Sequence, residues 1–473
     1  MNLPHTSRAL ADAAPVPYWL DRPERPDPLP PLTGPQHADL LVIGGGFGGL
    51  WAALLAKQAD PDRDVLLVDA GTCGWAASGR NGGFCAASLT HGLANGVDRF
   101  PAEVGELERL GRENLEAIAA TVAEFDIDCD FERTGELAVA VEPYQLDGLA
   151  ADADLARRYG HRVRLLDRDE VRAEVDSPTY LGGMIDADRV AMVDPAKLAW
   201  GLRRACLDLG VRVHEHTRVT GLRADRAALH AVTAGGPDAA PGSVRARRVV
   251  LATNAFPPLL RRLRAYVVPV YDHVLMTEPL TPAQRDAIGW RNRQGLADTG
   301  DQFHYYRITS DGRILFGGYD AVYHYGNRVA PELEQRHATF TTLAEHFFTT
   351  FPQLADVRFS HRWGGVIDTC TRFCPFYGTA YGGRLAYAAG YTGLGVGATR
   401  FSARVLLDLL DGRDTPLTRL DLVRRKPLPF PPEPVRAVGI NLTRWSLARA
   451  DAREGRRDLW LRTLDRLGLG FDS

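Results

Sequence analysis

The sequence is short of lysine and has no paired cysteine motif, and each shortage restricts the available chemistry. Lys57, Lys197 and Lys426 are the only lysines among 56 basic residues, so lysine-dependent chemistry has three candidates. The six cysteines include no CxxC pair and no spacing typical of zinc ligands. We therefore expect reduced thiols and no metal site, although a CxxxC spacing occurs at Cys370 and Cys374.

Long apolar runs and an excess of positive charge are also missing. No apolar run approaches the ~20 residues of a membrane span, and the polar, proline-rich N-terminus lacks the features of a secretory signal. The formal net charge of −3 gives no basic surplus of the kind that nucleic-acid-binding proteins normally carry. We therefore expect a cytoplasmic protein with neither a membrane nor a nucleic acid as its partner.

A glycine-rich turn follows the first expected strand. Residues 39–44 form an apolar run typical of a buried parallel strand, and they lead into Gly44-x-Gly46-x-x-Gly49 at the start of a helix. The first glycine permits a tight turn, the second lets the backbone approach a pyrophosphate, and the third allows close packing of helix on strand. Asp69 ends the next strand, where its carboxylate can accept hydrogen bonds from a ribose. The spacing predicts a dinucleotide site for FAD or NAD, and the alternative is a structural turn without a ligand.

A polar loop directly after the second strand favours a flavin. It reads Ala76-Ala-Ser78-Gly-Arg80-Asn81-Gly82-Gly83-Phe84. Such a loop can bring backbone amides, a hydroxyl and a guanidinium to a diphosphate or a flavin ring. Without precedent, the same loop is compatible with a mobile surface segment.

Nucleotide-binding elements recur along the chain, with segments of different character between them. Their positions near 39–85, 195–255 and 385–412 suggest one chain crossing twice between two domains, which 473 residues can supply. The predicted fold class is α/β, with a Rossmann-like FAD-binding domain interleaved with a mixed-sheet, α+β substrate domain. The expected parts are an N-terminal extension with nine prolines lying over the surface (1–36), the FAD-binding domain (37–104, 191–262 and 356–420), the substrate domain (105–190 and 263–355) and a C-terminal extension (421–473) with a helix over 441–467.

These motifs together carry a family resemblance. The glycine fingerprint and the Ala-Ser-Gly-Arg-Asn-Gly-Gly loop resemble the D-amino-acid-oxidase-like superfamily of FAD-dependent oxidoreductases. Within that superfamily the chain looks most like the gamma-glutamylputrescine oxidase branch of amine oxidases. The resemblance runs from about residue 37 to 435, and its matching stretches are 127–130, 305–318, 351–354, 362–365 and 389–397.

The resemblance implies FAD as cofactor and extends the set of residues that contact it. Val219 would meet the adenine through its backbone, Thr253 would lie where the Rossmann sheet closes over the cofactor, and 390–397 would place a helix N-terminus against the pyrimidine end of the flavin. A helix N-terminus there also suits the negative charge of a reduced flavin. The expected FAD-binding residues are Gly44, Gly46, Phe47, Gly48, Gly49, Asp69, Ala70, Ser78, Arg80, Asn81, Gly82, Gly83, Phe84, Val219, Thr253, Gly390, Tyr391, Gly393, Leu394, Gly395 and Val396.

The implied reaction is oxidation of a C–N bond in a small-molecule primary or secondary amine. The imine would hydrolyse to an aldehyde and ammonia or an amine, and oxygen would accept the electrons and become hydrogen peroxide. Arg80, His273 and Tyr306 are the candidate catalytic residues. Aromatic walls attract a protonated amine, and the candidates for such walls are Tyr271, His273, Tyr305, Tyr306, Tyr323, His324, Tyr325 and Trp363.

Three departures from the superfamily bear on the substrate, the acceptor and the flavin. An arginine that clamps a substrate carboxylate is absent around Trp363, although Arg362 adjoins the position, and this favours an amine over an α-amino acid. No lysine falls where related oxidases use one to help oxygen react, so either another charge, from Arg80 or a histidine, takes that part or the acceptor is not oxygen. Cys370 lies near the position of a covalent flavin link in some relatives, but its register is inexact, and we expect non-covalent FAD.

Three alternatives stay open from the sequence. One is an amine or amino-acid dehydrogenase that passes electrons to a non-oxygen acceptor, and another is a flavin-binding member without turnover. The third is an enzyme of specialised metabolism acting on an unusual amine. Segments 105–190 and 265–350 hold no decisive substrate motif, and the sequence does not determine the oligomeric state.

Overall fold

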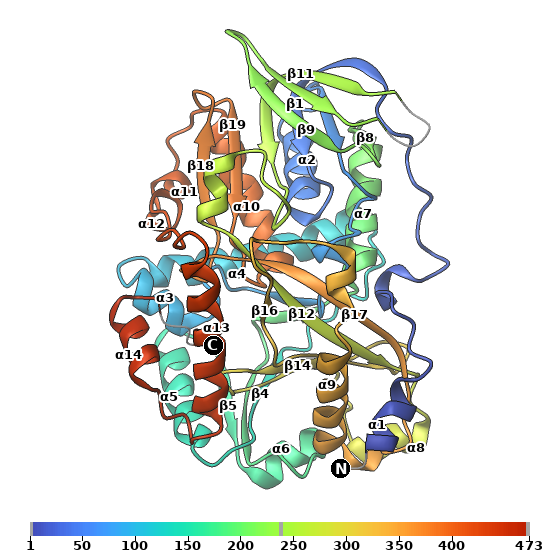
Figure 1. Ribbon diagram of the computed structural model, residues 1–473, viewed down its shortest axis with the longest axis vertical. Coiled ribbons are helices and arrows are strands. Elements are labelled where there is room, and N and C mark those ends of the chain that lie inside the picture. The colour runs from blue at the N-terminus through green and yellow to red at the C-terminus, as the bar shows by residue number, and fades with distance from the viewer. Residues whose placement is uncertain (1–2, 236–239, 470–473) are drawn as a thin grey trace.

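The computed structural model describes residues 3–235 and 240–469 and contains two large sheets and a small one. Figure 1 shows the eight-stranded sheet in the upper half of the molecule and the nine-stranded sheet in the lower half. The chain passes between the two sheets more than once, as the recurring nucleotide-type elements predict. Within the described ranges, no helix is both long enough and apolar enough to span a membrane.

The eight-stranded sheet is parallel from β19 to its edge strand β8, whereas β18, β10 and β9 form antiparallel pairs. Its order is β18-β19-β11-β1-β2-β8, and β10 joins β9 to β11. Strands at the centre are buried on both faces, which explains their continuous apolar sequences. The strands are β1 (Gly34–Ile43), β2 (Val65–Val68), β8 (Arg212–His214), β9 (Val219–Ala224), β10 (Leu229–Thr233), β11 (Gly242–Leu251), β18 (Phe376–Ala380) and β19 (Leu385–Ala389).

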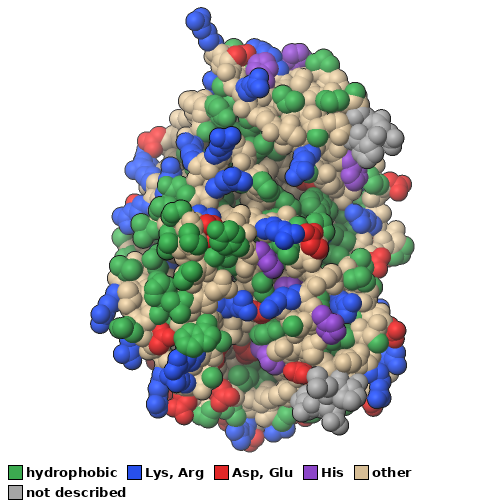
Figure 2. Space-filling model, viewed as in Figure 1, with side chains coloured by type: hydrophobic (Ala, Val, Ile, Leu, Met, Phe, Trp, Pro, Cys, Tyr) green, Lys and Arg blue, Asp and Glu red, His purple; other side chains and the backbone are tan. Residues whose placement is uncertain are grey.

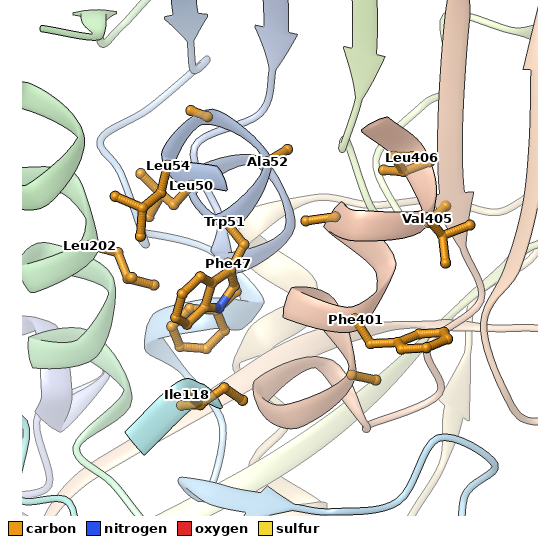
Figure 3. Close-up of a cluster of buried hydrophobic side chains, with 14 of the residues drawn as sticks. Phe47, Leu50, Trp51, Ala52, Leu54, Ile118, Leu202, Phe401, Val405 and Leu406 are labelled. Atoms are coloured by element: carbon orange, nitrogen blue, oxygen red, sulfur yellow. The ribbon is translucent and has the colours of Figure 1, made fainter. Parts of the chain in front are cut away.

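Three helices pack together on this sheet and build the largest core. Figure 3 shows α2 (Phe47–Ala59) between α7 (Pro195–Asp208) and α10 (Gly395–Leu410), with the indole of Trp51 directed into the cluster. Trp51, Leu50 and Phe401 are fully buried there. Burial of each large side chain contributes about 1.5–3 kcal/mol, so this cluster fixes the position of the α2 N-terminus and the glycine turn before it.

The nine-stranded sheet is mostly antiparallel. Its order is β16-β12-β15-β14-β13-β4-β6-β5, and β17 pairs with the other edge of β12. A two-stranded sheet of β3 (Phe84–Ala86) and β7 (Val190–Met192) lies apart from both. The strands of the nine-stranded sheet are β4 (Glu136–Ala140), β5 (Val163–Leu166), β6 (Gly182–Asp186), β12 (Val268–Thr277), β13 (Gly295–Asp298), β14 (His304–Ile308), β15 (Ile314–Gly318), β16 (Val322–Tyr323) and β17 (Phe359–Thr369).

The remaining helices surround the two sheets. In Figure 1, α9 covers one face of the nine-stranded sheet, and the C-terminal helices α13 and α14 run down the left side of the molecule. These helices are α1 (Leu3–Leu10), α3 (Leu93–Arg99), α4 (Val104–Glu124), α5 (Gln145–Arg158), α6 (Arg168–Glu174), α8 (Pro282–Ile288), α9 (His337–Thr350), α11 (Pro416–Arg419), α12 (Asp421–Arg424), α13 (Val435–Asp451) and α14 (Leu459–Arg466).

Both chain extensions differ from their expectations. The N-terminal segment does more than lie over the surface: Trp19 is 2% exposed and packs against Trp363, because this aromatic stretch fills the space beside the nine-stranded sheet. The single C-terminal helix expected over 441–467 is two helices, α13 and α14, separated by a turn at 452–458. Residues 1–2 and 470–473 of these extensions lie outside the described residues.

The expected domain boundaries stay a prediction, and sheet membership gives one reason to refine them. β17 falls inside the segment 356–420 that the sequence assigns to the FAD-binding domain. Its residues pair with β12 over nearly their full length, from Val268 opposite Thr369 to Thr277 opposite Phe359. This strand therefore belongs to the nine-stranded sheet, and the last crossover falls after it.

Candidate active site

A cavity of about 1430 Å³ is lined by residues of both large sheets. Ordinary small-molecule pockets occupy ~300–1,000 Å³, so this one has room for a large cofactor and a substrate together. We call its two parts the cofactor half, lined by the glycine turn, β2 and the α10 N-terminus, and the substrate half, lined by β12, β14, β17 and α13.

The glycine turn has no room for side chains. Gly44 has φ +114°, and a Cβ there would lie 2.3 Å from the Ala252 carbonyl oxygen. A Cβ on Gly49 would lie 1.8 Å from the carbonyl oxygen of Gly44. The turn therefore holds the N-terminus of α2 against the sheet, as the fingerprint predicts.

The N-terminus of α2 opens onto the cavity through Gly46, Phe47 and Gly48. Ser78 accepts a hydrogen bond from the Phe47 amide at 2.9 Å, which ties the 76–84 loop to the first turn of the helix. The other first-turn amides have no intrahelical acceptor, and together with the helix dipole they favour an anion such as a diphosphate.

Asp69 ends β2 beside this turn. Its carboxylate accepts hydrogen bonds from the amides of Gly45 at 2.6 Å and Gly71 at 2.7 Å and from the indole of Trp75 at 2.8 Å. Burial raises the pKa of Asp69, and these three donors oppose the rise. Since a carboxylate has about four acceptor positions, Asp69 keeps capacity for a ribose hydroxyl.

A second helix N-terminus faces the cavity at α10. Gly393, Leu394, Gly395 and Val396 line this region. The buried carboxylate of Asp368 accepts hydrogen bonds from the amides of the preceding turn, at 2.6 Å from Gly390 and 3.2 Å from Tyr391, and so holds the turn in place. Burial raises the pKa of Asp368 to about 7.

Most of the predicted FAD-binding residues come together around the cavity. Those that line it are Gly44, Gly46, Phe47, Gly48, Asp69, Ala70, Ser78, Arg80, Asn81, Gly82, Phe84, Val219, Thr253, Tyr391, Gly393, Leu394, Gly395 and Val396. Three predicted glycines, Gly49, Gly83 and Gly390, lie outside the lining. A Cβ on Gly83 would lie 2.1 Å from the Val193 carbonyl oxygen, and one on Gly390 would lie 2.7 Å from the Cys370 sulfur, so these glycines serve backbone packing.

Arg80 lies where the two halves meet. Its guanidinium donates to the carbonyl oxygens of Trp75 at 2.9 Å and Gly364 at 3.1 Å, and it pairs with Glu334 at 2.5 Å. The side chain lines the cavity while tying the 76–84 loop to β17. The N-terminal extension supports the same loop, because the Trp19 indole donates to the Asn81 carbonyl oxygen at 2.9 Å.

Two predicted catalytic residues, His273 and Tyr306, lie on the face of the nine-stranded sheet that α9 covers, away from the cavity. The described lining of the cavity includes neither of them. Tyr306 packs in the core under α9, and its hydroxyl lies 2.8 Å from that of Tyr180. His273 packs edge-on against Phe340 of α9, and burial lowers its pKa to about 4. Side chains alternate between the faces of a strand, so neither residue faces the cavity, and a catalytic role for either one stays a prediction that this packing does not favour.

Their sequence neighbours, Asp272 and Tyr305, face the cavity instead. Strand pairing places Tyr305 opposite Gly317 and Gly317 opposite Val274, which lies two residues from Asp272 on the same face. With no side chain at Gly317, the Tyr305 ring lies across β15, and its hydroxyl donates to the Asp272 carboxylate. Sequence analysis missed Asp272, and the signal that could have found it was the choice of face along β12.

The other proposed aromatic walls divide in the same way. Tyr271 joins Tyr305 in the described lining, whereas Tyr323, His324, Tyr325 and Trp363 do not. The Trp363 indole instead donates to the Arg80 carbonyl oxygen at 2.9 Å and supports the loop from behind.

The C-terminal extension supplies a wall that sequence analysis did not predict. Arg444 of α13 lines the cavity and pairs with Asp320 at 3.0 Å, while Arg336 holds the other oxygen of Asp320 at 2.6 Å. Asp451 at the end of α13 accepts the amides of Asp301 and Gln302. Figure 2 shows hydrophobic side chains gathered over α13 and α14 on the left of this view, and the exposed ones include Val435, Val438, Trp445 and Leu459.

The structure also shows where the residues lie on which the three departures from the superfamily depend. Arg362 pairs with Leu275 on the α9 face of the sheet, with its guanidinium over Phe340, so it does not reach the cavity. Of the residues that the structure describes around the cavity, none is a lysine. Cys370 is fully buried, and its thiol donates to the carbonyl oxygens of Cys374 and Gly390 rather than facing the cavity.

Comparisons with known proteins agree with this geometry. A family model described as FAD dependent oxidoreductase matches residues 39–409. The gamma-glutamylputrescine oxidoreductase of Escherichia coli (strain K12) is 31% identical over 412 residues, which cover 84% of this chain and 88% of that protein. A probable oxidoreductase OrdL of Haemophilus influenzae is 27% identical over 413 residues, or 85% of this chain and 89% of that protein.

A solved structure shows the same fold. Glycine oxidase from Geobacillus kaustophilus superposes with a TM-score of 0.67 at 21% identity, covering 82% of this chain and 99% of that one. The polar groups of the cofactor half suit FAD: two helix N-termini offer amide donors to its anionic parts, the Asp69 carboxylate can accept from a ribose hydroxyl, and the 76–84 loop lies beside both.

Proposed function

The chain belongs to the family of FAD-dependent oxidoreductases, and on that premise we propose that it oxidises a C–N bond of a primary or secondary amine. FAD, when bound, supplies the acceptor for the hydride equivalent that leaves the substrate carbon. The proposed product is an imine, which water converts to an aldehyde and ammonia or an amine. The relative named as a gamma-glutamylputrescine oxidoreductase supports this class of substrate.

One observation carries the choice of an amine over an α-amino acid: the arginines of the substrate half are already engaged. Arg80 pairs with Glu334, and Arg444 pairs with Asp320. Arg436 of α13 donates to the Pro431 carbonyl oxygen and to Oδ1 of Asn327, and Arg362 lies on the far face of the sheet. A carboxylate clamp needs a guanidinium free to form a bidentate pair. The described cavity wall offers carboxylates and tyrosines in its place, which suit a cation.

The residues of this chain bind and orient the amine and exclude water. Tyr271 and Tyr305 provide the aromatic wall, and the 76–84 loop sets where the substrate half meets the cofactor half. Arg444 and Asp451 hold α13 across the cavity, which limits the access of solvent to an imine. The proposal includes a cytoplasmic location, and cell fractionation tests that part.

Anaerobic spectroscopy of the purified FAD-loaded protein tests the reaction. We expect one amine class among putrescine derivatives, sarcosine and D-alanine to bleach the flavin absorbance, and an amine without an α-carboxylate to be the most effective. Detection of the matching aldehyde confirms cleavage at a C–N bond. If no amine or amino acid bleaches the flavin, the proposal is wrong.

Oxygen is the proposed acceptor, with a carrier or quinone as the second candidate. The absence of lysine from the described lining favours the second candidate, because related oxidases are expected to use a lysine in the reaction with oxygen. Admitting air to the reduced protein separates the two. Rapid return of the flavin colour with one hydrogen peroxide per turnover supports oxygen, and slow return in air with rapid reoxidation by a soluble quinone supports a dehydrogenase.

A further inference from the structure

Asp272 is partly buried and borders the cavity. It lines the substrate half and keeps part of its surface open to it. Its carboxylate accepts hydrogen bonds from the Tyr305 hydroxyl and from the amides of His273, at 2.8 Å, and Gly318. Three donors leave one of the four acceptor positions of a carboxylate for a ligand.

The charges around Asp272 are unbalanced. Asp320 lies nearby and has two arginine partners, Arg336 and Arg444. Asp272 forms no ion pair with the part of the chain that the structure describes. Placing a carboxylate in a low-dielectric site is costly unless a cation accompanies it, so this site is electrostatically incomplete as it stands.

Two glycines, one in a strand and one in a loop, leave the space in which Tyr305 lies against Asp272. A Cβ on Gly317 of β15 would lie 2.6 Å from Cζ of Tyr305, and one on Gly82 of the 76–84 loop would lie 2.8 Å from the same ring. The ring therefore occupies space that any larger residue at either position would take. This arrangement connects Asp272 directly to the loop that borders the cofactor half.

The geometry points to Asp272 as the carboxylate that binds the ammonium group of the substrate. This inference rests on the proposed function, because it takes an amine as the ligand. An alkylammonium supplies the missing positive charge and an N–H donor for the open acceptor position, while Tyr305 adds an aromatic wall beside the cation. Tyr305 acts as a positioning residue, because its hydroxyl fixes the carboxylate.

Glu136 is the competing site, since it also lines the cavity without an ion pair among the described residues. It lies on β4, and β13, β14 and β15 separate it from β12. Four strand spacings of about 4.8 Å thus stand between the two carboxyls. Asp272 is favoured because Tyr305 joins it to Gly82 at the border of the cofactor half. Burial and the neighbouring Asp186 raise the pKa of Glu136 to about 7, so at neutral pH Glu136 is less fully ionised than Asp272.

Binding of a probe to the oxidised, FAD-loaded full chain tests the inference without turnover. The probes are n-butylamine and its neutral analogue n-butanol. Binding of each probe is measured from the change that it causes in the flavin absorbance. Asp272→Asn keeps the shape of the side chain and the Tyr305 hydrogen bond but removes the charge. Glu136→Gln is the matched control inside the cavity. Asp167→Asn is the control outside it, because Asp167 is exposed and asparagine also caps α6.

We expect Asp272→Asn to weaken butylamine binding about 30-fold, the size typical for one partner of an enclosed charge pair, and to leave butanol binding unchanged. Both controls should bind butylamine as the wild type does. Equal butylamine affinity in wild type and Asp272→Asn overturns the inference, as does a loss confined to Glu136→Gln or a parallel loss of butylamine and butanol.

The wild type alone gives a second test if Asp272→Asn does not fold. Butylamine stays protonated from pH 5 to 8, because its pKa is near the ~10.4 of lysine. Burial raises the pKa of Asp272 to about 6, with Asp320 adding to the rise and the Tyr305 hydroxyl opposing it. Butylamine affinity should therefore increase as the pH rises through about 6, and a flat profile contradicts the inference.

The outcomes also separate this inference from the proposed function. If butylamine binds through Asp272 but no amine bleaches the flavin, the ammonium site stands and amine oxidation fails. If amines bleach wild type and Asp272→Asn at the same rate and affinity, amine oxidation stands and the ammonium site fails.

Discussion

Along β12 and β14, adjacent residues of similar chemistry lie on opposite faces of the nine-stranded sheet. Asp272 and Tyr305 face the cavity and keep accessible surface, whereas His273 and Tyr306 lie under α9 and are 0% and 1% exposed. Polar groups of the α9 face are surrounded by Phe316, Phe340 and other core residues. One sheet thus provides an apolar packing surface on one side and a polar binding wall on the other.

The difference shows on which face of the sheet the fold encloses a charge without a partner. On the α9 face, burial lowers the pKa of His273 to about 4, so its side chain is neutral at pH 7. The Tyr306 hydroxyl is hydrogen-bonded to that of Tyr180, so this face encloses little charge. On the cavity face, Asp272 is enclosed as a carboxylate without a cation. Because folding does not require this unpaired carboxylate, its electrostatic cost favours a role for Asp272 in binding.

The largest expected effect comes from filling the space under the Tyr305 ring. Gly317→Ala places a Cβ 2.6 Å from that ring and should displace Tyr305 from Asp272. We expect amine-driven flavin bleaching to slow about 100-fold, the effect of a displacement of about 1 Å in a binding group. The control is Gly221→Ala in β9, where a Cβ meets nothing within 4 Å. Equal rates in the two variants would show that Tyr305 is not needed in its present position.

A second prediction concerns stability rather than rate. The pKa of Asp272 is raised from 3.8 to about 6 in the folded protein, so its ionised form costs up to about 3 kcal/mol above pH 6 and nothing below about pH 4. Asp272→Asn should therefore raise the free energy of unfolding at pH 8, with the gain shrinking as the pH falls towards 4. Urea titrations with excess FAD at pH 8 and pH 5 measure the change, and a loss of stability at pH 8 would mean that the carboxylate serves the fold.

Much of the cofactor half could be predicted from the sequence because its chemistry depends on glycine. Gly44 has a positive φ that favours glycine, and a Cβ on Gly46 would lie 2.9 Å from the Ser78 hydroxyl oxygen, so the spacing of these glycines is visible in the sequence. The α/β fold class, FAD and the family resemblance that followed from them are confirmed by the match over 39–409 and by the fold of glycine oxidase.

The substrate half could not be predicted to the same depth because it depends on tertiary register. Choosing His273 over Asp272, or Tyr306 over Tyr305, is a shift of one residue, and such a shift moves a side chain to the other face. Only the pairing of Tyr305 with Gly317 and the packing of α9 decide which face is which. Likewise, nothing in the local sequence of α13 shows that Arg444 reaches Asp320 across the cavity.

A smaller effect is expected on the α9 face. Tyr306→Phe leaves the buried Tyr180 hydroxyl without its partner at 2.8 Å and should lower the free energy of unfolding by about 1 kcal/mol. Tyr180→Phe/Tyr306→Phe removes both hydroxyls and should recover most of that loss. Urea titration detects both changes, and an additive loss in the double variant would contradict the pairing.

The smallest effect is expected at Cys370. Its thiol is buried and bonded to backbone carbonyls, so acid precipitation should release all FAD from wild type and from Cys370→Ala alike. Flavin absorbance in the supernatant is the measurement. Flavin that stays with the wild-type pellet but not with the variant would show a covalent link.

The most direct test of this account compares the rate of anaerobic flavin bleaching by one amine in Tyr305→Phe and Tyr306→Phe. The two variants lose the same hydroxyl one residue apart, on opposite faces of one strand. The account predicts bleaching about 10-fold slower in Tyr305→Phe, since a hydrogen bond to a charged group contributes about 1.5 kcal/mol or more, and a wild-type rate in Tyr306→Phe. Slow bleaching in Tyr306→Phe with a wild-type rate in Tyr305→Phe would contradict it.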